Sequence, residues 1–276
     1  MPIRDRYPAG VPCWVDSEQP DPVAGAEFYA GLFGWRLEDR MPADAPGHFF
    51  EASLDGGRVA AVGSQPQPGP PEWTTYIAVD SADAAAERVR AAGGTVEIEP
   101  FDVFDAGRMA KCKDPEGATF CVWQAGRNIG AQVVNVPGTW NFSGLNTRDV
   151  EAAQRFYGAV FGWRFAVLDY GSTMVMVPGY GDYLESIDPG VKQRHASAGA
   201  PPGFTDAVAW LDALEDGPAR WSVSFTVADA DASAARAAEL GATILAEPFD
   251  VPWQRVTVIR DPQGAELTLS QFKPPA

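Results

Sequence analysis

The chain has 276 residues, of which 46% are hydrophobic, and a formal net charge of −16 at pH 7. This acidity argues against nucleic acid and anionic membrane as partners, because both require clustered lysine and arginine. The charge would suit a cationic ligand, although acidic residues spread over the surface for solubility are the simpler explanation. The N-terminal residues lack the apolar core of a signal peptide and no apolar run is long enough to span a bilayer, so we expect a cytoplasmic protein.

The three cysteines, Cys13, Cys112 and Cys121, have neither the spacing of a metal knuckle nor that of a disulfide framework. We expect them to be reduced and mostly buried. Glycine-rich phosphate-binding motifs are absent, so the sequence suggests no cofactor that is held through its phosphates.

One stretch of the chain occurs twice. Residues 28–36 return as residues 156–164 with six of nine positions identical, and residues 73–123 return as residues 221–270. Such self-similarity indicates a duplicated unit. The offset between the copies rises from 128 to 148 along the chain, which places an insertion of about twenty residues between Met176 and Asp206.

The first module is predicted in this order along the chain. A strand at 11–15 is followed by a helix. Asp21 as N-cap and Pro22 in the first turn indicate where this helix begins. The helical spacing directs Phe28 and Trp35 toward a core, and Gly34 ends the helix. Three strands follow at 35–39, 48–54 and 58–62, with a hairpin turn at 55–57.

The same order of elements then begins again. Residues 64–71 are rich in proline and form a stiff connector. A strand at 74–79 leads to an alanine-rich helix at 83–92, and strands follow at 95–99, 108–113 and 118–124. Asp114 to Gly117 form the tight turn between the last two strands.

The second half repeats both modules. Residues 140–145 are predicted as a strand, and Asp149 caps a helix that carries Phe156 and Tyr157. Strands at 163–168, 172–177 and 204–211 complete the third module, which is interrupted by a segment rich in glycine and proline. The fourth module then repeats the second, so the chain contains four βαβββ modules.

This pattern resembles the vicinal oxygen chelate superfamily, which includes glyoxalase I, extradiol dioxygenases and bleomycin-binding proteins. The tandem arrangement is similar to an actinobacterial branch of glyoxalase-like proteins. The resemblance implies an α+β fold with curved mixed sheets around a cavity. The resemblance also implies two domains joined by a linker at 126–138. The first domain, 1–125, contains modules 11–63 and 73–124. The second domain, 139–276, contains module 139–211, which is interrupted by an insertion near 178–203, and module 220–272.

In metal-dependent members of this superfamily, histidines and glutamates from the first and last strands of the modules bind one divalent ion. Register places these ligand positions on Trp14, Phe142, Thr74, Ser222, Cys121 and Thr268. None is a histidine or carboxylate, although such an ion needs about three ligands of that class. His48 and His195, the two histidines of the chain, lie in different halves. We therefore expect no metal and no cofactor.

Aromatic residues at and near these positions suit a flat organic ligand, which could also be cationic. For the first half, a pocket and a filled core remain equally open. The second half has smaller residues, so we expect it to hold the more open pocket, with Tyr180 and Tyr183 in a loop that could act as a lid. The candidate ligand-binding residues are Trp14, Asp16, Tyr76, Cys121, Trp123, Phe142, Ser222, Ser224, Thr268, Tyr180, Tyr183 and Trp253.

Three functions remain open at this point, and the third, a structural or interaction protein, would require both cavities to be filled. The first is a metal-independent protein that binds, sequesters or presents an aromatic natural product such as an antibiotic. The second is an enzyme without a metal, for example a hydroxylase, cyclase, isomerase or lyase, with Asp16, Glu51 or Glu266 as its base. The sequence does not name the ligand. Because the two fused halves can already form a pseudo-dimer, we expect a monomer.

Overall fold

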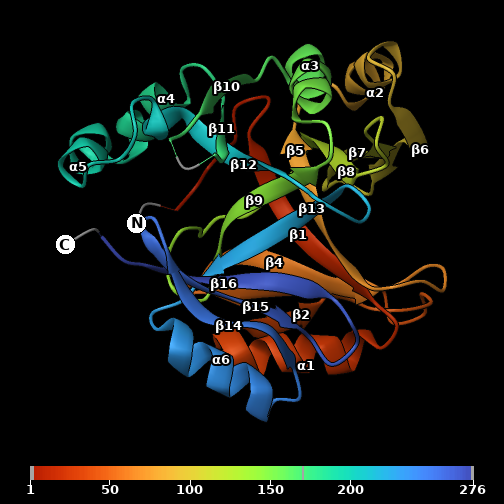
Figure 1. Ribbon diagram of the computed structural model, residues 1–276. Coiled ribbons are helices and arrows are strands. Elements are labelled where there is room, and N and C mark those ends of the chain that lie inside the picture. Colours follow the sequence, from red (N-terminus) through yellow and green to blue (C-terminus); the bar gives the residue numbers. More distant parts are fainter. Residues whose placement is uncertain (1–2, 170, 275–276) are drawn as a thin grey trace. The chain divides into compact units, whose positions relative to one another are not determined.

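The computed structural model describes residues 3–169 and 171–274. Four βαβββ modules follow one another along this part of the chain (Figure 1), as predicted. None of the helices in these two ranges has the length and apolarity needed to cross a bilayer.

The bounds of the elements agree with the predicted order, module by module. The first module comprises β1 (Pro12–Gln19), α1 (Pro22–Phe33), β2 (Arg36–Asp39), β3 (Phe49–Leu54) and β4 (Gly57–Ser64). The second comprises β5 (Glu72–Ala78), α2 (Ala82–Ala91), β6 (Thr95–Val103), β7 (Gly107–Lys113) and β8 (Thr119–Ala125). The third comprises β9 (Trp140–Thr147), α3 (Val150–Phe161), β10 (Arg164–Val167), β11 (Thr173–Met176), α4 (Tyr180–Ile187), α5 (Val191–Ser197), η1 (Phe204–Asp206) and β12 (Ala207–Ala213). The fourth comprises β13 (Arg220–Thr226), α6 (Ala230–Glu239), β14 (Thr243–Val251), β15 (Gln254–Arg260) and β16 (Glu266–Phe272).

The strands form two mixed sheets of eight strands each. Their orders are β2-β3-β4-β1-β5-β8-β7-β6 and β10-β11-β12-β9-β13-β16-β15-β14. In the first sheet β1 pairs with β4 in parallel, whereas β3 and β4 form an antiparallel hairpin. Both sheets thus repeat one topology, which confirms the predicted α+β fold.

Local signals in the sequence explain where the helices begin and end. The carboxylates of Asp21 and Asp149 accept a hydrogen bond from the amide three residues later, and these bonds cap α1 and α3. Both helices end at a glycine in the left-handed conformation, Gly34 and Gly162, which is the conformation that glycine adopts without steric cost.

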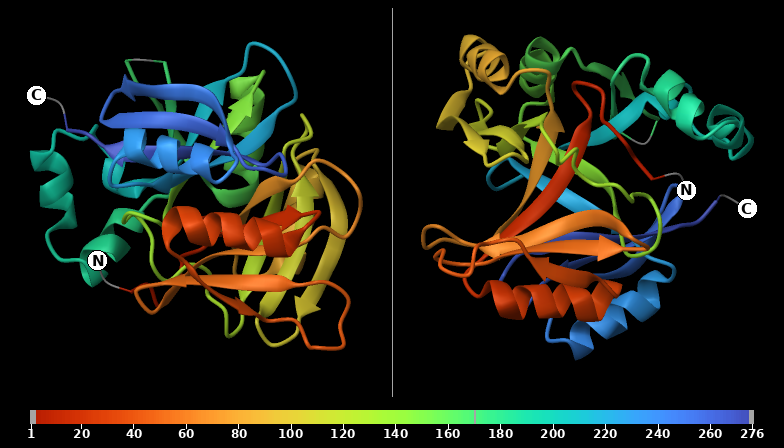
Figure 2. Two further views of the ribbon diagram at one scale, coloured as in Figure 1. Left: turned by 90° about the horizontal axis from the view of Figure 1, so that it is seen from below. Right: turned by 180° about the vertical axis from the view of Figure 1, so that it is seen from behind.

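The described residues pack into two compact units, and each half of the chain contributes one module to each unit. Unit 1 contains Met1–Cys13, Thr75–Gly130 and Phe142–Trp221, while unit 2 contains Trp14–Thr74, Ala131–Asn141 and Ser222–Ala276. Within unit 1, α2 lies beside α3, and within unit 2, α1 lies beside α6 (Figure 1 and Figure 2). Each helix therefore packs with the helix of a module from the other half.

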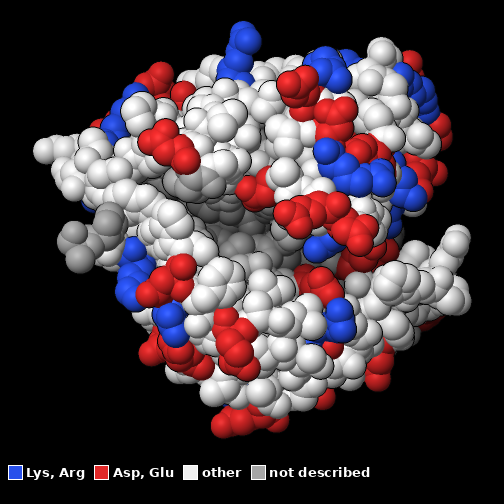
Figure 3. Space-filling model, in the orientation of Figure 1, with Lys and Arg blue, Asp and Glu red and all other residues white. Residues whose placement is uncertain are grey.

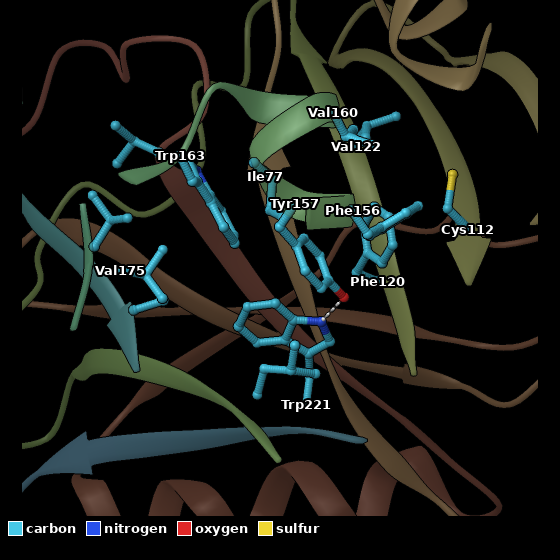
Figure 4. Packing of buried hydrophobic residues seen from close by; sticks show 14 of the residues in the cluster. Ile77, Cys112, Phe120, Val122, Phe156, Tyr157, Val160, Trp163, Val175 and Trp221 are labelled. Carbon is cyan, nitrogen blue, oxygen red and sulfur yellow. Dashed lines mark hydrogen bonds between the residues drawn. The ribbon is translucent and has the colours of Figure 1, made fainter. Parts of the chain in front are cut away.

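A hydrogen-bonded chain of tryptophan, tyrosine and aspartate lies in the core of unit 1. Trp221 Nε1 donates to the Tyr157 hydroxyl over 2.9 Å, as Figure 4 shows. The Tyr157 hydroxyl donates in turn to Asp114 Oδ2 over 3.1 Å. Apolar side chains such as Phe120 and Phe156 surround these groups. We call this arrangement the Trp–Tyr–Asp chain.

Unit 2 contains the same arrangement at the repeated positions. Trp73 Nε1 donates to the Tyr29 hydroxyl over 2.9 Å, and that hydroxyl donates to Asp261 Oδ2 over 2.8 Å. Gln19 Nε2 adds a second donor to Asp261 Oδ2 at 2.8 Å. The predicted turns that begin with aspartate thus also hold a tyrosine from the other half of the chain, a role that the sequence analysis did not predict.

The inserted segment of the third module differs from our expectation. Tyr180 and Tyr183 lie on the helix α4 and are buried, so the loop predicted for them is wrong. The insertion is rich in glycine and proline, but Tyr180, Tyr183, Leu184 and Ile187 recur at helical spacing. Burying this apolar face stabilises the helix.

The N-terminal segment is fixed to the insertion by Arg4. The Arg4 guanidinium is 5.8 Å from the ring centroid of Tyr180 and 5.9 Å from those of Tyr7 and Tyr183. Such cation–aromatic contacts are strongest where the cation is shielded from water, and only 7% of the Arg4 surface is exposed. The Tyr183 hydroxyl also donates to the Arg6 carbonyl over 2.8 Å.

Candidate functional site

In the first half, four residues that pair with one another in register form a row across four strands of unit 2. Asp16 on β1 is opposite Ala61 on β4, which is opposite Glu51 on β3, which is opposite Glu38 on β2. Residues that pair across strands point to the same face, so three carboxylates share this face. We call these four residues the first-half row. Trp14 precedes Asp16 by two residues and shares its face.

Arginines accompany the carboxylates of the first-half row. Arg40 Nη2 is 2.7 Å from Glu51 Oε1, and Arg40 also bonds to Glu38. Arg58 Nε is 3.9 Å from Glu51 Oε2. Glu51 is therefore an ion-pair partner, which makes it a poor candidate for the general base that the sequence suggested.

The second half has a row at the equivalent positions, but its residues are of different types. This row lies in unit 1. Gly144 on β9 is opposite Trp210 on β12, which is opposite Met174 on β11, which is opposite Ala166 on β10. Gly144 repeats the position of Asp16, and Trp210 takes the register position of Ala61. We call Gly144, Trp210, Met174 and Ala166 the second-half row. It has no charged residue.

Three aromatic rings gather on the face of the second-half row. Phe142, two residues before Gly144, lies 5.8 Å from Trp210 and 6.3 Å from Phe204 between ring centroids. Phe204 lies 6.4 Å from Trp210. All three side chains are half-buried. We call Phe142, Phe204 and Trp210 the aromatic cluster, and its partial exposure leaves ring surface that a ligand can cover.

His195 on α5 lies next to this cluster. Its ring is 5.1 Å from that of Phe204 at an interplanar angle of 74°, and its Nδ1 is 3.1 Å from the Thr205 hydroxyl. Burial and the neighbouring charge of Arg194 lower the pKa of His195, while Asp188 opposes this shift. The imidazole is therefore largely neutral near pH 7. His195 could not be identified as a site residue from the sequence, because the inserted segment gives no register from which its neighbours could be predicted.

The other predicted residues of the first half fill space. Tyr76 and Trp123 are buried and meet edge to face at 6.3 Å, and Trp123 Nε1 donates to the Asn128 carbonyl over 2.8 Å. Cys121 is 1% exposed and pairs in register with Tyr76. Trp14 and Asp16 are both buried as well. The residues predicted to line a first-half pocket thus lie within packed regions of the two units.

The corresponding face in the fourth module, which belongs to unit 2, carries smaller and more accessible side chains. Ser224 pairs in register with Thr268, and both are half-buried, as is Ser222. Ser270 is buried and its hydroxyl lies 2.9 Å from Gln254 Oε1. Ser222, Ser224 and Thr268 are therefore less buried than Tyr76 and Trp123 of the first half.

Four further predicted residues make other contacts or lie in a turn. Glu266 Oε1 is 2.7 Å from Arg260 Nη2 at the surface. Trp253 occupies the turn between β14 and β15 with a positive φ of 71°. Tyr183, like Tyr180, is buried against Arg4. These contacts do not favour Glu266 as a base.

The residues at the positions of metal ligands in related folds do not fit a divalent ion. Trp14 and Phe142 offer only apolar ring atoms, and Thr74, Ser222, Cys121 and Thr268 supply hydroxyls and a thiol rather than imidazole or carboxylate. Among the described residues, no group of three or more histidine, cysteine, aspartate and glutamate side chains is placed to hold a metal ion.

Charges are interspersed on the molecular surface shown in Figure 3, where lysine and arginine alternate with aspartate and glutamate. Ion pairs such as Arg108 with Asp83 and Arg255 with Asp231 also hold opposite charges next to each other. Such an arrangement is typical of a surface charged for solubility.

Comparison with known proteins identifies the family. Residues 19–122 match the glyoxalase/bleomycin resistance protein/dioxygenase superfamily, and residues 144–270 match a glyoxalase-like domain. The chain is 38% identical to the putative glyoxylase CFP32 of Mycobacterium bovis, over 99% of both chains. It is 35% identical to the anthracycline biosynthesis protein DauV of Streptomyces sp. (strain C5), over 97% of this chain and 95% of the relative.

A solved structure with the same fold is the Mn(II)-bound glyoxalase from Novosphingobium aromaticivorans. Its TM-score is 0.61 at 16% sequence identity, with coverage of 95% of this chain and 82% of that one. The paired βαβββ modules, both family matches and the full-length relatives agree. The chain therefore belongs to the glyoxalase/bleomycin resistance protein/dioxygenase superfamily.

Proposed function

We propose that this protein binds a planar aromatic natural product on the aromatic cluster of its second half, without a metal ion. The observation that carries the proposal is the set of three half-buried rings, Phe142, Phe204 and Trp210, within about 6 Å of one another. A flat ligand can stack on such rings and remove apolar surface from water.

The second-half row supports this choice of ligand. Gly144, which is opposite Trp210 in register, has no side chain, and Met174, on the other side of Trp210, is a fully buried apolar residue. A charged ligand group would meet no counter-ion among the four residues of this row. The ligand surface that faces the row is therefore apolar.

The relatives support the proposed ligand class. The names of two of them, DauV and a protein of Streptomyces peucetius that is 35% identical over 97% of this chain, refer to anthracycline biosynthesis. Anthracyclines contain a flat anthraquinone ring system, which has the shape that stacking on the aromatic cluster requires. We therefore extend the proposal to hydroxylated polycyclic quinones and related aromatic polyketides.

Binding without turnover is favoured over catalysis. Glu51 is paired with Arg40, and Glu266 is paired with Arg260 at the surface, so two of the three candidate bases are neutralised. The alternative, a metal-independent enzyme of secondary metabolism, would have the buried Asp16 as its remaining candidate base. Recovery of the ligand after incubation distinguishes the two functions, because an enzyme returns a changed product.

The test is a fluorescence titration of metal-stripped protein with alizarin, a dihydroxyanthraquinone. We expect saturable quenching that is unchanged by added divalent ions, with alizarin recovered intact. Trp210→Ala should raise the Kd roughly thirtyfold, since truncating an aromatic anchor costs about 2 kcal/mol. Trp210→Phe keeps a ring at this position and serves as the matched control. Binding that requires a metal ion, or that survives Trp210→Ala unchanged, contradicts the proposal.

A further inference from the structure

We infer that the ligand carries a ring hydroxyl and that His195 forms a hydrogen bond to it, so that His195 selects phenolic ring systems over unsubstituted ones. This inference rests on the proposed function and adds the chemical class of the ligand to it. His195 would then supply a polar, selective contact beside the apolar rings of the aromatic cluster.

The first support is the position of the imidazole. His195 packs against Phe204, which is itself a member of the aromatic cluster, so a ligand stacked on the cluster reaches the edge of the imidazole. Planar ligands carry their hydroxyl groups at the ring edge. The contact therefore needs no movement of the ligand away from the aromatic rings.

The second support is the set of bonds that His195 makes. Nδ1 is engaged by the Thr205 hydroxyl at 3.1 Å, and the ring is held against Phe204. Within residues 3–169 and 171–274, no protein group bonds to Nε2. The fixed ring thus keeps one nitrogen for a ligand, and a hydroxyl suits either tautomer because it can donate or accept.

The third support is the charge around the imidazole. On α5 itself, Arg194 disfavours a second positive charge, and its Nη2 is paired with Asp188 at 2.5 Å. On η1, Asp206 Oδ1 accepts from the Gly181 amide over 2.6 Å. Lys192 is paired with Asp182 on α4 at 2.5 Å. The carboxylates near His195 are thus already engaged, and the neutral imidazole is able to accept a phenolic proton donor.

The selectivity belongs to the second half alone. His195 lies in the insertion, which the first half lacks. The histidine of the first half, His48, is exposed, and its Nδ1 is 2.6 Å from Asp39 Oδ2. His48 therefore supplies a matched control at which a change of histidine should have no effect.

The experiment compares alizarin with anthraquinone, which has the same ring skeleton without hydroxyls, in the same buffer. We expect the wild-type protein to bind alizarin about tenfold more tightly, which corresponds to one net hydrogen bond. His195→Phe should reduce the ratio of the anthraquinone Kd to the alizarin Kd to about one. The affinity for anthraquinone should change by less than about threefold, because the ring surface is kept. His48→Gln should leave the ratio unchanged.

Two additional measurements protect the test from a folding artefact. His195→Gln, which keeps a hydrogen-bonding side chain, should retain part of the ratio. Acidification of the wild-type protein through the lowered pKa of His195 should change the ratio, because the imidazolium can donate to the ligand hydroxyl but can no longer accept from it. A ratio that is the same in wild type and His195→Phe overturns the inference but leaves the proposed function standing. If neither probe binds to the wild-type protein, both fail.

Discussion

The two halves of the chain repeat one core and differ on the face that a ligand could reach. Both contain a Trp–Tyr–Asp chain, with Tyr29 and Tyr157 at equivalent positions. The first-half row contains three carboxylates accompanied by arginines, whereas the second-half row contains none. The core positions carry the same residues in both halves, while the two rows differ in charge.

This difference indicates where the ligand binds. In the first half, the residues at the expected ligand positions are buried, with Trp14 and Asp16 each 6% exposed. In the second half, Phe142 and Trp210 keep accessible ring surface, and the insertion adds His195 and Phe204 beside them. A binding site requires accessible atoms, so the second half is the stronger candidate.

The largest expected effect is a loss of folding stability when either tyrosine of the repeated core is replaced. Tyr157→Phe leaves Trp221 Nε1 and Asp114 Oδ2 without their shared hydroxyl and should lower the free energy of unfolding by about 2 to 3 kcal/mol. Tyr29→Phe should cost about 1 to 2 kcal/mol, because Gln19 still donates to Asp261 Oδ2. Urea unfolding of both variants measures the difference, and equal losses would contradict this account of the two units.

The next effect concerns the insertion that distinguishes the halves. Arg4→Ala removes the guanidinium from between three tyrosine rings and should lower the free energy of local opening of α4 by about 1 to 2 kcal/mol. Native-state hydrogen exchange of the α4 amides measures this opening, with the α3 amides as an internal control. Unchanged exchange in α4 would show that Arg4 does not anchor the insertion.

A pH-dependent effect should follow from Asp114. Burial raises the pKa of Asp114 above its usual value of about 3.8. The folded state then binds this proton more tightly than the unfolded state, so stability falls as pH rises from about 3.8 through the raised pKa. Asp114→Asn should remove this fall, which unfolding curves at a series of pH values would measure. A difference between wild type and variant that does not change with pH would refute the assignment.

The smallest expected effect is the change in ligand affinity when a residue of the first-half row is replaced. Asp16→Asn should change the affinity for alizarin by less than about twofold, since the proposed site lies on the second-half row. The same titration that measures Trp210→Ala provides the comparison. A loss of affinity similar to that of Trp210→Ala would move the site to the first half, and loss of turnover alone would point to a base.

Much of the fold could be predicted from the sequence because its signals are local and repeated. Capping aspartates, left-handed glycines and duplicated stretches specify the four modules. The Trp–Tyr–Asp chains could not be predicted, because they join residues such as Tyr29 and Asp261 that are distant in sequence. The helix α4 was missed because the glycines and prolines of residues 178–203 obscured the helical spacing of Tyr180 and Tyr183.

The candidate site could be predicted only in part. Period-two alternation places Asp16 on the face of Trp14. Trp210 required the pairing of β9 with β12, and no local signal in the sequence provides that register. His195 required the fold of an insertion without a counterpart elsewhere in the chain.

The most direct test of the proposed site is a crystal structure of the protein with bound alizarin. Our account predicts the anthraquinone rings stacked on Phe142 and Trp210, with a hydroxyl within hydrogen-bonding distance of His195 Nε2. Alizarin bound against Trp14 and Asp16, with Phe142 and Trp210 left uncovered, would contradict it.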